Sequence, residues 1–463
     1  MEAEPTAVVL AAGKGTRMKS DLPKVLHECF GEAMITHVCR SLRRSRIPRQ
    51  IAVLGTGKQQ VENVLRESVE TVEQKQQKGT GHAVQQAVEE LNMADEVPLI
   101  VTCGDIPGIR PETYESVVKQ MLEGEADAVV LTSRLDDPSG YGRVVCSDQG
   151  LVEQIVEDAD ASSDQKQIKL VNTGIICATA GTFRKQLPQL SNDNESGEYY
   201  LTDVIGLIRN DGGRVESVEV QDNWEITGIN TRRQLVEFEQ EGYRRQNQHF
   251  LDNGVTVRDP QRVKIGPWVE IGEDVELEGD VTIIGESTVG RGSRICGRVQ
   301  VTDSVIGEEN DIRDSTLSSA RLGNGVRVGP YCHVRPGTEV GDGVRLGNFV
   351  EIKKSTVQSH TNIAHLSYIG DAEVGADVNV GAGTITCNYD GYEKHKTTIE
   401  DHVFIGSNSE LVAPVTVGEG AMIGAGSTVT EDVPKDSLYL SRAGETIRKQ
   451  WVEEVWRPRK ESD

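Results

Sequence analysis

The segment LGNGVRVGPYCHVRPGTEVGDGVRLGNFVEI, residues 322–352, carries an aliphatic residue at every sixth position. The same spacing runs through residues 265–301 and 399–429, and glycine often follows the aliphatic residue. An α-helix repeats about every 3.6 residues and an amphipathic strand at every second residue, so neither accounts for a period of six. A triangular solenoid does, because each hexapeptide supplies one short strand and one turn. The spacing therefore predicts a prism with three faces of parallel strands.

The length and composition of this region fit such a prism. Three hexapeptides make one coil, so residues 263–433 provide about nine coils. At ~4.8 Å per coil, the prism is roughly 45 Å long. A prism this thin needs a core of small aliphatic side chains and many tight turns. The aromatic content is only 4%, and 27 of the 48 glycines lie after residue 251.

Upstream of about Gly228, apolar runs of strand length alternate with amphipathic stretches of helix length. This alternation predicts an α/β domain with a mostly parallel sheet covered on both faces. Ligands of such sheets bind at the carboxyl ends of the strands. The predicted strands cover residues 7–12, 51–54, 99–103, 128–132 and 173–177, and two of the predicted helices cover 83–91 and 112–122.

A charged stretch separates the two patterns. Residues 232–253 have helical spacing with a narrow apolar stripe at Leu235, Val236 and Phe238, and Gly254 follows. We interpret this stretch as a connecting helix. The predicted domains are therefore residues 1–231 and 254–463, joined by a linker helix over 232–253.

The overall charge of the chain restricts which classes of molecule it can bind. Lys and Arg number 49 against 73 Asp and Glu, which gives a formal charge of -24. Nucleic-acid binders and membrane-surface proteins need cationic faces, so we expect small-molecule partners instead. No run approaches the ~20 apolar residues of a spanning helix. The N-terminus lacks the basic start of a secretory signal, and the eight cysteines form no C-x-x-C pair, so we expect a cytoplasmic protein with reduced thiols.

A basic, glycine-rich segment follows the first predicted strand directly. It reads LAAGKGTRMKSDLPK over residues 10–24, and Gly13 and Gly15 allow backbone N–H groups to converge on an anion. A second buried strand, in LIVTCGDIP at residues 99–107, ends in Asp105 at the same sheet edge. Mg²⁺ bound to phosphates takes one or two such carboxylates. The alternatives are a solvated basic loop and an Asp that only caps a turn. The four cations of the segment are Lys14, Arg17, Lys19 and Lys24.

Two cations of the solenoid are predicted to stack. Arg335 and Lys353 each follow an aliphatic hexad position, and their positions differ by three hexads, or one coil. Their backbones should therefore lie about 5 Å apart on adjacent coils. Such a pair repels itself unless an anion lies between the two charges, and phosphate is the natural candidate, whereas splaying into solvent is the alternative. His365 lies nearby, and residues 379–391 interrupt the hexads, which predicts a loop projecting from the prism.

Further motifs carry a resemblance to known families. QKQQKGTGHA at 74–83, DPSGYGR at 137–143, IVE at 155–157, NTGI at 172–175, GEYYLTD at 197–203 and GINTR at 228–232 resemble the sugar-phosphate nucleotidyltransferases. RPGT at 335–338, NFVEIKK at 348–354, GAGTITCNYDG at 381–391 and APVTVG at 413–418 resemble the left-handed β-helix acyltransferases. Together, the chain resembles the family of bifunctional UDP-N-acetylglucosamine pyrophosphorylase/glucosamine-1-phosphate N-acetyltransferases.

The resemblance implies a Rossmann-like α/β nucleotidyltransferase domain followed by a left-handed parallel β-helix of hexapeptide repeats, in a homotrimer. It implies that acetyl-CoA acetylates glucosamine 1-phosphate. The product then reacts with UTP in the presence of Mg²⁺ to give pyrophosphate and UDP-N-acetylglucosamine, a precursor of peptidoglycan and lipopolysaccharide. One alternative stays open, in which the β-helix of a nucleotidyltransferase serves only for oligomerisation.

The same resemblance implies roles for residues in the first domain. Arg17 and Lys24 would neutralise the triphosphate, and Asp105 with Asn230 would ligate Mg²⁺. The implied sugar-binding residues are Gly142, Glu157, Asn172 and Asn230. The implied nucleotide-binding residues are Leu10, Ala11, Ala12, Gly13, Lys24, Gln74, Gly79 and Thr80.

In the solenoid, the resemblance implies that His365 is the general base, with Glu351 as a possible partner for its ring. Arg335, Lys353, Tyr368 and Asn379 would bind the sugar phosphate. The implied acetyl-CoA-binding residues are Ala382, Asn388, Tyr389, Ser407, Ala425 and Arg442. A zinc site at His333, His360 and His365 is the competing hypothesis, although positions 333 and 365 do not differ by a multiple of six.

Overall fold

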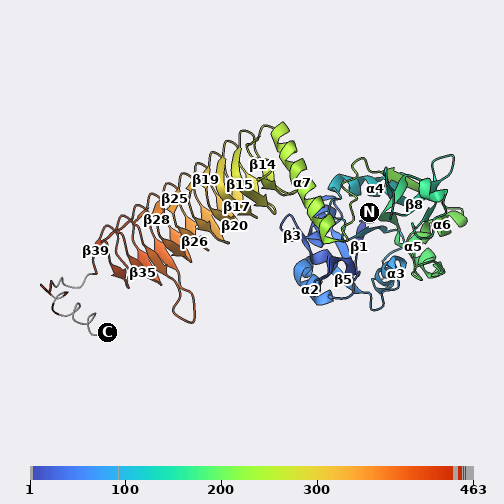
Figure 1. Ribbon diagram of the computed structural model, residues 1–463. Coiled ribbons are helices and arrows are strands. Elements are labelled where there is room, and N and C mark those ends of the chain that lie inside the picture. Colours follow the sequence, from blue (N-terminus) through green and yellow to red (C-terminus); the bar gives the residue numbers. More distant parts are fainter. Residues whose placement is uncertain (1–3, 92, 442–446, 451, 453, 455–463) are drawn as a thin grey trace. The chain divides into compact units, whose positions relative to one another are not determined.

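The computed structural model describes residues 4–91, 93–441, 447–450, 452 and 454, and it divides into two compact units, Met1–Glu241 and Gly242–Asp463 (Figure 1). Helix α7, Arg232–Asp252, begins in the first unit and ends in the second. Within the described ranges, no helix combines the length and the apolar character needed to span a membrane.

The first unit is built on one mixed sheet with the strand order β11-β7-β10-β6-β1-β4-β5. The central strands β6, β1, β4 and β5 are parallel, and β11 is parallel to β7. Strand β10 is antiparallel to both of its neighbours, β6 and β7. The sheet is therefore mostly parallel, as predicted. The strands are β1 (Thr6–Ala11), β4 (Arg49–Leu54), β5 (Glu70–Glu73), β6 (Pro98–Cys103), β7 (Ala128–Arg134), β10 (Leu170–Thr179) and β11 (Val215–Glu219), with β8 (Arg143–Cys146) and β9 (Val152–Val156) as a hairpin beside β10.

Helices cover both faces of this sheet because successive residues of its buried strands are apolar on both sides. In β1, Ala7 and Val9 belong to one core and Val8 to the other. Helices α1 (Met34–Arg44), α2 (Lys58–Leu65) and α4 (Pro111–Glu123) contribute to the first core, and α3 (Thr80–Glu90), α5 (Ala180–Gln186) and α6 (Asp203–Asn210) to the second. Because the helices pack on the two faces of the sheet, the edge at which its parallel strands end is left open to ligands.

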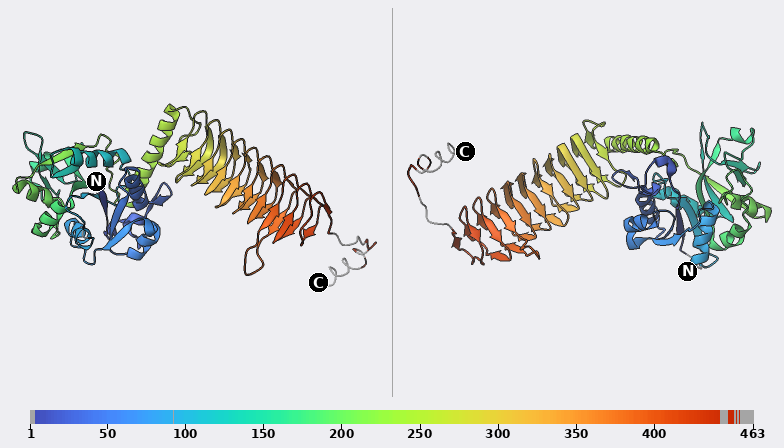
Figure 2. Two further views of the ribbon diagram at one scale, coloured as in Figure 1. Left: turned by 180° about the vertical axis from the view of Figure 1, so that it is seen from behind. Right: turned by 60° about the horizontal axis from the view of Figure 1, so that its bottom comes forward.

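The second unit is a parallel β-helix, as the hexapeptide spacing predicts (Figures 1 and 2). Within the described residues, nine strands stack on one face, one per coil, which agrees with the predicted number of coils. They are β14 (Glu270–Ile271), β16 (Thr288–Val289), β18 (Val305–Ile306), β21 (Ala320–Leu322), β24 (Thr338–Val340), β27 (Thr356–Val357), β30 (Ala372–Val374), β33 (Thr397–Ile399) and β36 (Val415–Val417).

The other two faces share long strands that turn a corner of the prism. Strands β15 (Glu276–Ile284) and β17 (Arg294–Thr302) pair in register over their whole length. The strands that follow them are β19 (Asp311–Arg313), β20 (Thr316–Ser318), β22 (Arg327–Val328), β23 (His333–Val334), β25 (Arg345–Asn348), β26 (Glu351–Lys353), β28 (Asn362–His365), β29 (Tyr368–Gly370), β31 (Asn379–Val380), β32 (Ile385–Cys387), β34 (Phe404–Ile405), β35 (Glu410–Val412), β37 (Met422–Ile423), β38 (Thr428–Val429) and β39 (Leu438–Tyr439).

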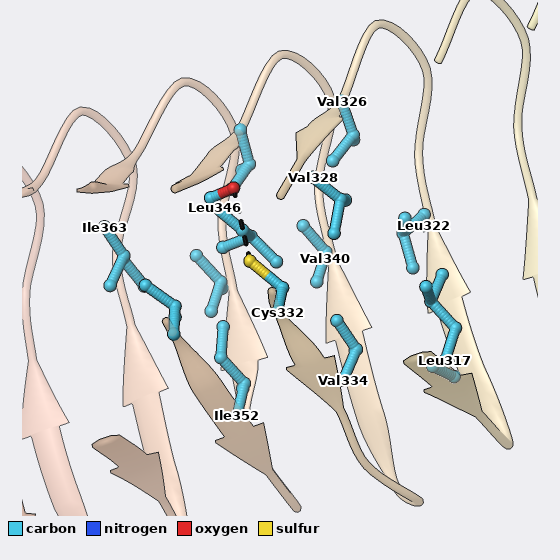
Figure 3. Close-up of a cluster of buried hydrophobic side chains, with 14 of the residues drawn as sticks. Leu317, Leu322, Val326, Val328, Cys332, Val334, Val340, Leu346, Ile352 and Ile363 are labelled. Atoms are coloured by element: carbon cyan, nitrogen blue, oxygen red, sulfur yellow. Dashed lines mark hydrogen bonds between the residues drawn. The ribbon is translucent and has the colours of Figure 1, made fainter. Parts of the chain in front are cut away.

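The aliphatic hexad positions fill the interior. Figure 3 shows Val328, Val334, Val340, Leu346 and Ile352 inside the prism, and all five are buried. Each coil adds only a few such side chains, so the core is a thin column rather than a sphere. This explains why the region needs so few aromatic residues.

The coil length departs from the prediction. Glu270 pairs with Thr288, three full hexads later, whereas Val305 pairs with Arg321, which falls short of three hexads. The predicted coil of three full hexads is therefore right for some coils and wrong for others. Buried polar side chains at the corners compensate the shorter coils, because their oxygens accept N–H groups that would otherwise lack an acceptor. Asn310 is one of them, since its Oδ1 accepts from the backbone N–H of Val326, on the next coil, at 2.6 Å.

Replacing Asn310 by alanine should lower the free energy of unfolding of the solenoid by about 3 kcal/mol. The Nδ2 group also donates to the carbonyls of Gly307 and Gly323, at 2.7 and 3.0 Å. The Gly307 carbonyl keeps the Ser293 hydroxyl as a donor, but the change removes the partners of the Val326 N–H and the Gly323 carbonyl. Denaturant unfolding followed by circular dichroism measures the loss. Asn362→Ala, at an exposed position of β28, is the matched control. Equal stability of the two variants would contradict the corner role of Asn310.

The loop predicted at residues 379–391 is present as a hairpin, but it begins later, because β31 and β32 keep residues 379–380 and 385–387 in the prism. Glu373 pairs with Thr398, well beyond three hexads, so one coil contains an insertion between β32 and β33. The insertion closes through an antiparallel bridge between Tyr389 and Lys394. In Figure 1 and in the left view of Figure 2 this hairpin, coloured orange-red, stands out from the prism.

Candidate functional site

A cleft of about 830 Å³ opens at the carboxyl ends of β1 and β6. It is bordered by the glycine-rich segment, which contributes Lys14 and Lys24 to its lining, as expected for a polyphosphate ligand. The structure brings together every residue predicted to bind the nucleotide: Leu10, Ala11, Ala12, Gly13, Lys24, Gln74, Gly79 and Thr80 all line this cleft, as does Asp105.

The sequence dictates the path of the glycine-rich segment. Gly15 has φ +60°, and a Cβ there would lie 2.6 Å from the Cβ of Lys24, so only glycine fits. This close approach lets the Lys24 side chain reach the cleft. Gln77, which sequence reasoning missed, lines the same cleft and donates from Nε2 to the carbonyl of Ala12.

Two oxygens and two cations meet at the edge of the cleft. The Lys24 ammonium pairs with Asp105 Oδ2 and donates to Asn230 Oδ1 at 3.1 Å, and Arg17 Nη2 donates to the same oxygen at 2.8 Å. Asp105 and Asn230 therefore present oxygens to one cation, Lys24 Nζ. Such oxygens are the ligands that Mg²⁺ prefers, and Mg²⁺ completes its shell with phosphates and waters. The residues thus fit the implied metal.

Three of the residues predicted to contact the sugar, Gly142, Glu157 and Asn172, adjoin one another, whereas Asn230 contacts Arg17 and Lys24. Glu157 is largely buried and accepts from Thr202 Oγ1 at 2.9 Å. Burial raises the pKa of the Glu157 carboxyl, and the Thr202 hydrogen bond opposes that shift. The N–H of Asn172 donates to the carbonyl of Gly142 at 2.8 Å, and a Cβ on Gly142 would lie 3.4 Å from Glu157 Oε2.

The charges of Asp105, Lys24 and Glu157 all act on the Cys103 thiol. It lines the cleft, and its pKa is raised to about 12 by burial and then by the charge of Asp105, with Glu157 adding to the shift and Lys24 opposing it. Sequence reasoning missed this thiol as part of the site. Its place at the end of β6, two positions before Asp105, was the available signal.

In the second unit, Arg335 and Lys353 lie on adjacent coils. The strands that precede them pair Val334 with Ile352, and the N–H of Arg335 donates to the Ile352 carbonyl at 2.8 Å. Glu351, considered above as a partner for the His365 ring, instead accepts from Arg335 Nη1 at 2.7 Å. Among the described residues, no hydrogen bond joins Glu351 to the His365 ring, so the structure gives that pairing no support.

A third cation joins this pair from the hairpin. Lys394 lies close enough to Lys353 to be the main cause of the lowered pKa of Lys353, and Arg335 contributes further. Asp371 opposes the shift. Three cations that crowd together in this way favour an anion between them. Sequence reasoning missed Lys394.

His365, Ala382, Ser407 and Ala425 form one column along the prism. In each step, the N–H of the residue after the later member donates to the carbonyl of the earlier member, at 3.3, 2.7 and 2.8 Å. The column spans roughly 14 Å at ~4.8 Å per coil. Among the described residues, none hydrogen-bonds the exposed His365 ring. The predicted acetyl-CoA residues thus extend from the predicted base as a track suited to a long, thin ligand, while Arg442 lies outside the described residues.

The remaining predicted residues lie on strands and on the hairpin of the same coils. Tyr368 on β29 pairs with Glu351, and Asn379 on β31 pairs with Asn362. Asn388 and Tyr389 belong to the hairpin, and Asn388 Nδ2 donates to Asp371.

Tyr331, Phe349 and Leu366 form an exposed apolar ridge on the coils that lead up to the column, and Leu366 directly follows His365. The three side chains are 59%, 56% and 64% exposed, on three consecutive coils. The rings of Tyr331 and Phe349 stack with their centroids 5.2 Å apart. All three residues have positive φ, which is uncommon for bulky side chains. Large apolar groups held outward in this way mark an interaction surface.

The competing zinc hypothesis gains no support. His333 lies on β23 and His365 on β28, whereas His360 lies in a turn between strands. In the part of the chain that the structure describes, no three His, Cys, Asp or Glu side chains are grouped closely enough to hold a metal ion.

Comparison with known proteins matches both units. Residues 7–173 match the MobA-like NTP transferase domain, and residues 319–354 and 396–431 match the bacterial transferase hexapeptide (six repeats). The "Bifunctional protein GlmU" of Carboxydothermus hydrogenoformans is 44% identical over 96% of this chain and 99% of its own length. The proteins of that name from Halalkalibacterium halodurans and Oceanobacillus iheyensis are 44% and 45% identical, each over 96% of this chain and 98% of its own length.

Proposed function

Because this chain belongs to the family of bifunctional GlmU proteins, it is both a UDP-N-acetylglucosamine diphosphorylase and a glucosamine-1-phosphate N-acetyltransferase, and we propose how its residues divide the two reactions. Residues 1–231 are the uridylyltransferase domain and 254–463 the acetyltransferase domain, with 232–253 as the linker helix. This assignment rests on two separate groups of cations. Arg17 and Lys24 lie in the first unit, and Arg335, Lys353 and Lys394 lie in the second.

In the uridylyltransferase domain, the sugar phosphate attacks the α-phosphorus of UTP in line and displaces pyrophosphate. The protein needs no nucleophile of its own, so its work is to position the substrates and stabilise charge. Arg17 and Lys24 lie where they can neutralise the transferring group and the leaving pyrophosphate. Asp105 and Asn230 would hold Mg²⁺, which neutralises phosphate charge when bound.

The walls of the cleft select the two substrates of this reaction. The cleft residues Leu10–Gly13, Gln74, Gly79 and Thr80 bind the nucleotide, because they line one cavity next to Lys24. The adjoining residues Gly142, Glu157, Asn172 and Asn230 bind the sugar.

In the acetyltransferase domain, His365 removes a proton from the ammonium of glucosamine 1-phosphate. The neutral amine attacks the thioester carbon of acetyl-CoA and the CoA thiolate leaves. Arg335 and Lys353, with Lys394, hold the sugar phosphate, and Tyr368 and Asn379 contact the same substrate. Acetyl-CoA lies along Ala382, Ser407 and Ala425 with Asn388 and Tyr389 beside it, and we assign Arg442 to it as well.

The arrangement favours an active solenoid over one that only oligomerises the chain. A purely structural prism has no use for grouping Lys353 with Lys394 and Arg335, because like charges placed close together cost stability. The product serves as a precursor of peptidoglycan and lipopolysaccharide. We place the enzyme in the cytoplasm, where UTP and acetyl-CoA are available. All eight cysteines lie in the described part of the chain and are free thiols, which supports this.

Product analysis tests the two reactions together. Incubation with glucosamine 1-phosphate, acetyl-CoA, UTP and Mg²⁺ should yield CoA, pyrophosphate and UDP-N-acetylglucosamine. Omitting acetyl-CoA should stop product formation unless N-acetylglucosamine 1-phosphate is supplied. If that supplied sugar reacted while glucosamine 1-phosphate released no CoA, the solenoid would be an oligomerisation module only.

We propose a homotrimer in which the ridge of Tyr331, Phe349 and Leu366 packs against a second copy of the chain. The wild-type mass in solution should be three times that of one chain. Phe349→Asp should lower this mass and reduce acetyl transfer about tenfold or more, because a carboxylate cannot be buried at an apolar contact. Analytical ultracentrifugation and CoA release measure the two effects. Leu122→Asp, at a single exposed apolar residue of α4, should change neither, and an unchanged mass in Phe349→Asp would remove the ridge from the interface.

A further inference from the structure

The hairpin that carries Lys394 is fastened to the prism at its base. Asn388 donates to Asp371, and Lys396 pairs with Glu373, so both arms of the hairpin are tied to the preceding coil. Between the arms, the N–H of His395 donates to the carbonyl of Asn388 at 2.8 Å. The base therefore has a fixed position on the prism.

The tip is closed by one carboxylate. Asp390 Oδ1 accepts from the backbone N–H groups of Tyr392 and Glu393 at 2.8 and 2.7 Å, and Oδ2 lies 2.7 Å from His395 Nε2. The Glu393 N–H and then His395 hold the pKa of Asp390 well below its usual range. Asp390 is consequently a carboxylate that bridges the turn and the returning arm of the hairpin.

Lys394 lies between the two residues that this carboxylate binds, Glu393 and His395. It lines one hollow with Lys354 and Asp371. It lies close enough to Lys353 to lower the pKa of that lysine, so without a bound anion the two charges repel each other. A flexible hairpin would relieve that repulsion by moving Lys394 away. Asp390 holds the Glu393 backbone on one side of Lys394 and the His395 ring on the other, and these contacts oppose this movement.

We infer that Asp390 and His395 form a clasp that positions Lys394 for the sugar phosphate, and that they act as positioning residues for acetyl transfer. The inference rests on the proposed function, in which Arg335, Lys353 and Lys394 bind that phosphate. The clasp holds three cations together before the anion arrives, so less ordering is needed on binding.

Steady-state acetyl transfer by the full-length protein tests the clasp. Asp390→Ala should raise the KM for glucosamine 1-phosphate about tenfold, with kcat within about threefold, because substrate binding is affected more than the chemical step. His395→Phe should act in the same direction, and His395→Asn, which keeps a donor, should recover part of the loss. Lys394→Ala should raise the same KM at least as much. Adding Asp390→Ala to Lys394→Ala should change it little further, since the clasp acts through that lysine.

The chain supplies a matched control. Asp377 and His402 form another Asp–His pair of the solenoid, with Oδ2 3.9 Å from Nδ1, and Asp377→Ala should leave both kinetic constants unchanged. If Lys394→Ala raises KM but Asp390→Ala does not, the clasp is wrong and the phosphate site stands. If Lys394→Ala itself has no effect, the proposed cation cluster is wrong. Additive effects of Asp390→Ala and Lys394→Ala would assign Asp390 a role that is independent of Lys394.

Discussion

Replacing His365 by alanine is expected to reduce acetyl transfer by about 10²- to 10⁴-fold and to leave uridylyl transfer unchanged. The substrate amine is an ammonium at neutral pH and becomes a nucleophile only after losing a proton. Within the described residues, the exposed His365 ring has no hydrogen-bond partner, so its nitrogens remain available to a substrate. It also heads the column that continues through Ala382 and Ser407. Release of the CoA thiol measures the loss, and pyrophosphate release measures the other reaction.

Two comparisons make this result specific. His360→Ala removes another imidazole from the solenoid, at a turn that carries none of the proposed site, and should retain acetyl transfer. Added imidazole should restore part of the activity of His365→Ala by replacing the missing base. Loss of both transferase activities in His365→Ala would contradict independent sites, and full acetyl transfer would exclude His365 as the base.

The hexapeptide spacing was sufficient to predict the prism because every aliphatic position in it faces the same narrow core. It could not predict the coils that are shorter than three hexads. Those depend on buried side chains such as Ser304 and Asn310, whose oxygens accept N–H groups at the corners. In the sequence, these residues look like ordinary turn residues. Only the stacking of the coils shows which N–H groups their oxygens accept.

The candidate sites divide in the same way. Arg335 and Lys353 could be paired by arithmetic, since both follow hexad positions on an unbroken run. Lys394 could not be paired with them by arithmetic, because it lies on a hairpin whose length breaks the hexad count. Only the folded structure shows that it lies close to Lys353. The hydrogen bond between Arg335 and Glu351 was missed for a related reason, since it depends on how adjacent coils pair. In the first unit, the position of Asp105 could be predicted from the sequence. It follows β6, and β6 ends at the same edge of the sheet as its parallel neighbour β1.

Asp105→Ala should reduce uridylyl transfer about 100- to 1000-fold while acetyl transfer persists. The carboxylate pairs with Lys24 and shares that cation with Asn230, so its loss removes both the proposed metal ligand and the group that orients the lysine. The two effects are separable, because loss of a metal ligand raises the Mg²⁺ concentration needed for half-maximal pyrophosphate release, whereas misplacement of Lys24 does not.

Asp105→Asn, which retains one oxygen, should have an activity between those of Asp105→Ala and the wild type. Asp136→Ala, at an exposed carboxylate that pairs with Lys169, should behave as wild type. Undiminished Mg²⁺-dependent pyrophosphate release by Asp105→Ala would remove Asp105 from the site. The amide oxygen of Asn230 would then be the one proposed protein ligand left beside Lys24, and a single amide oxygen is too little to hold the metal.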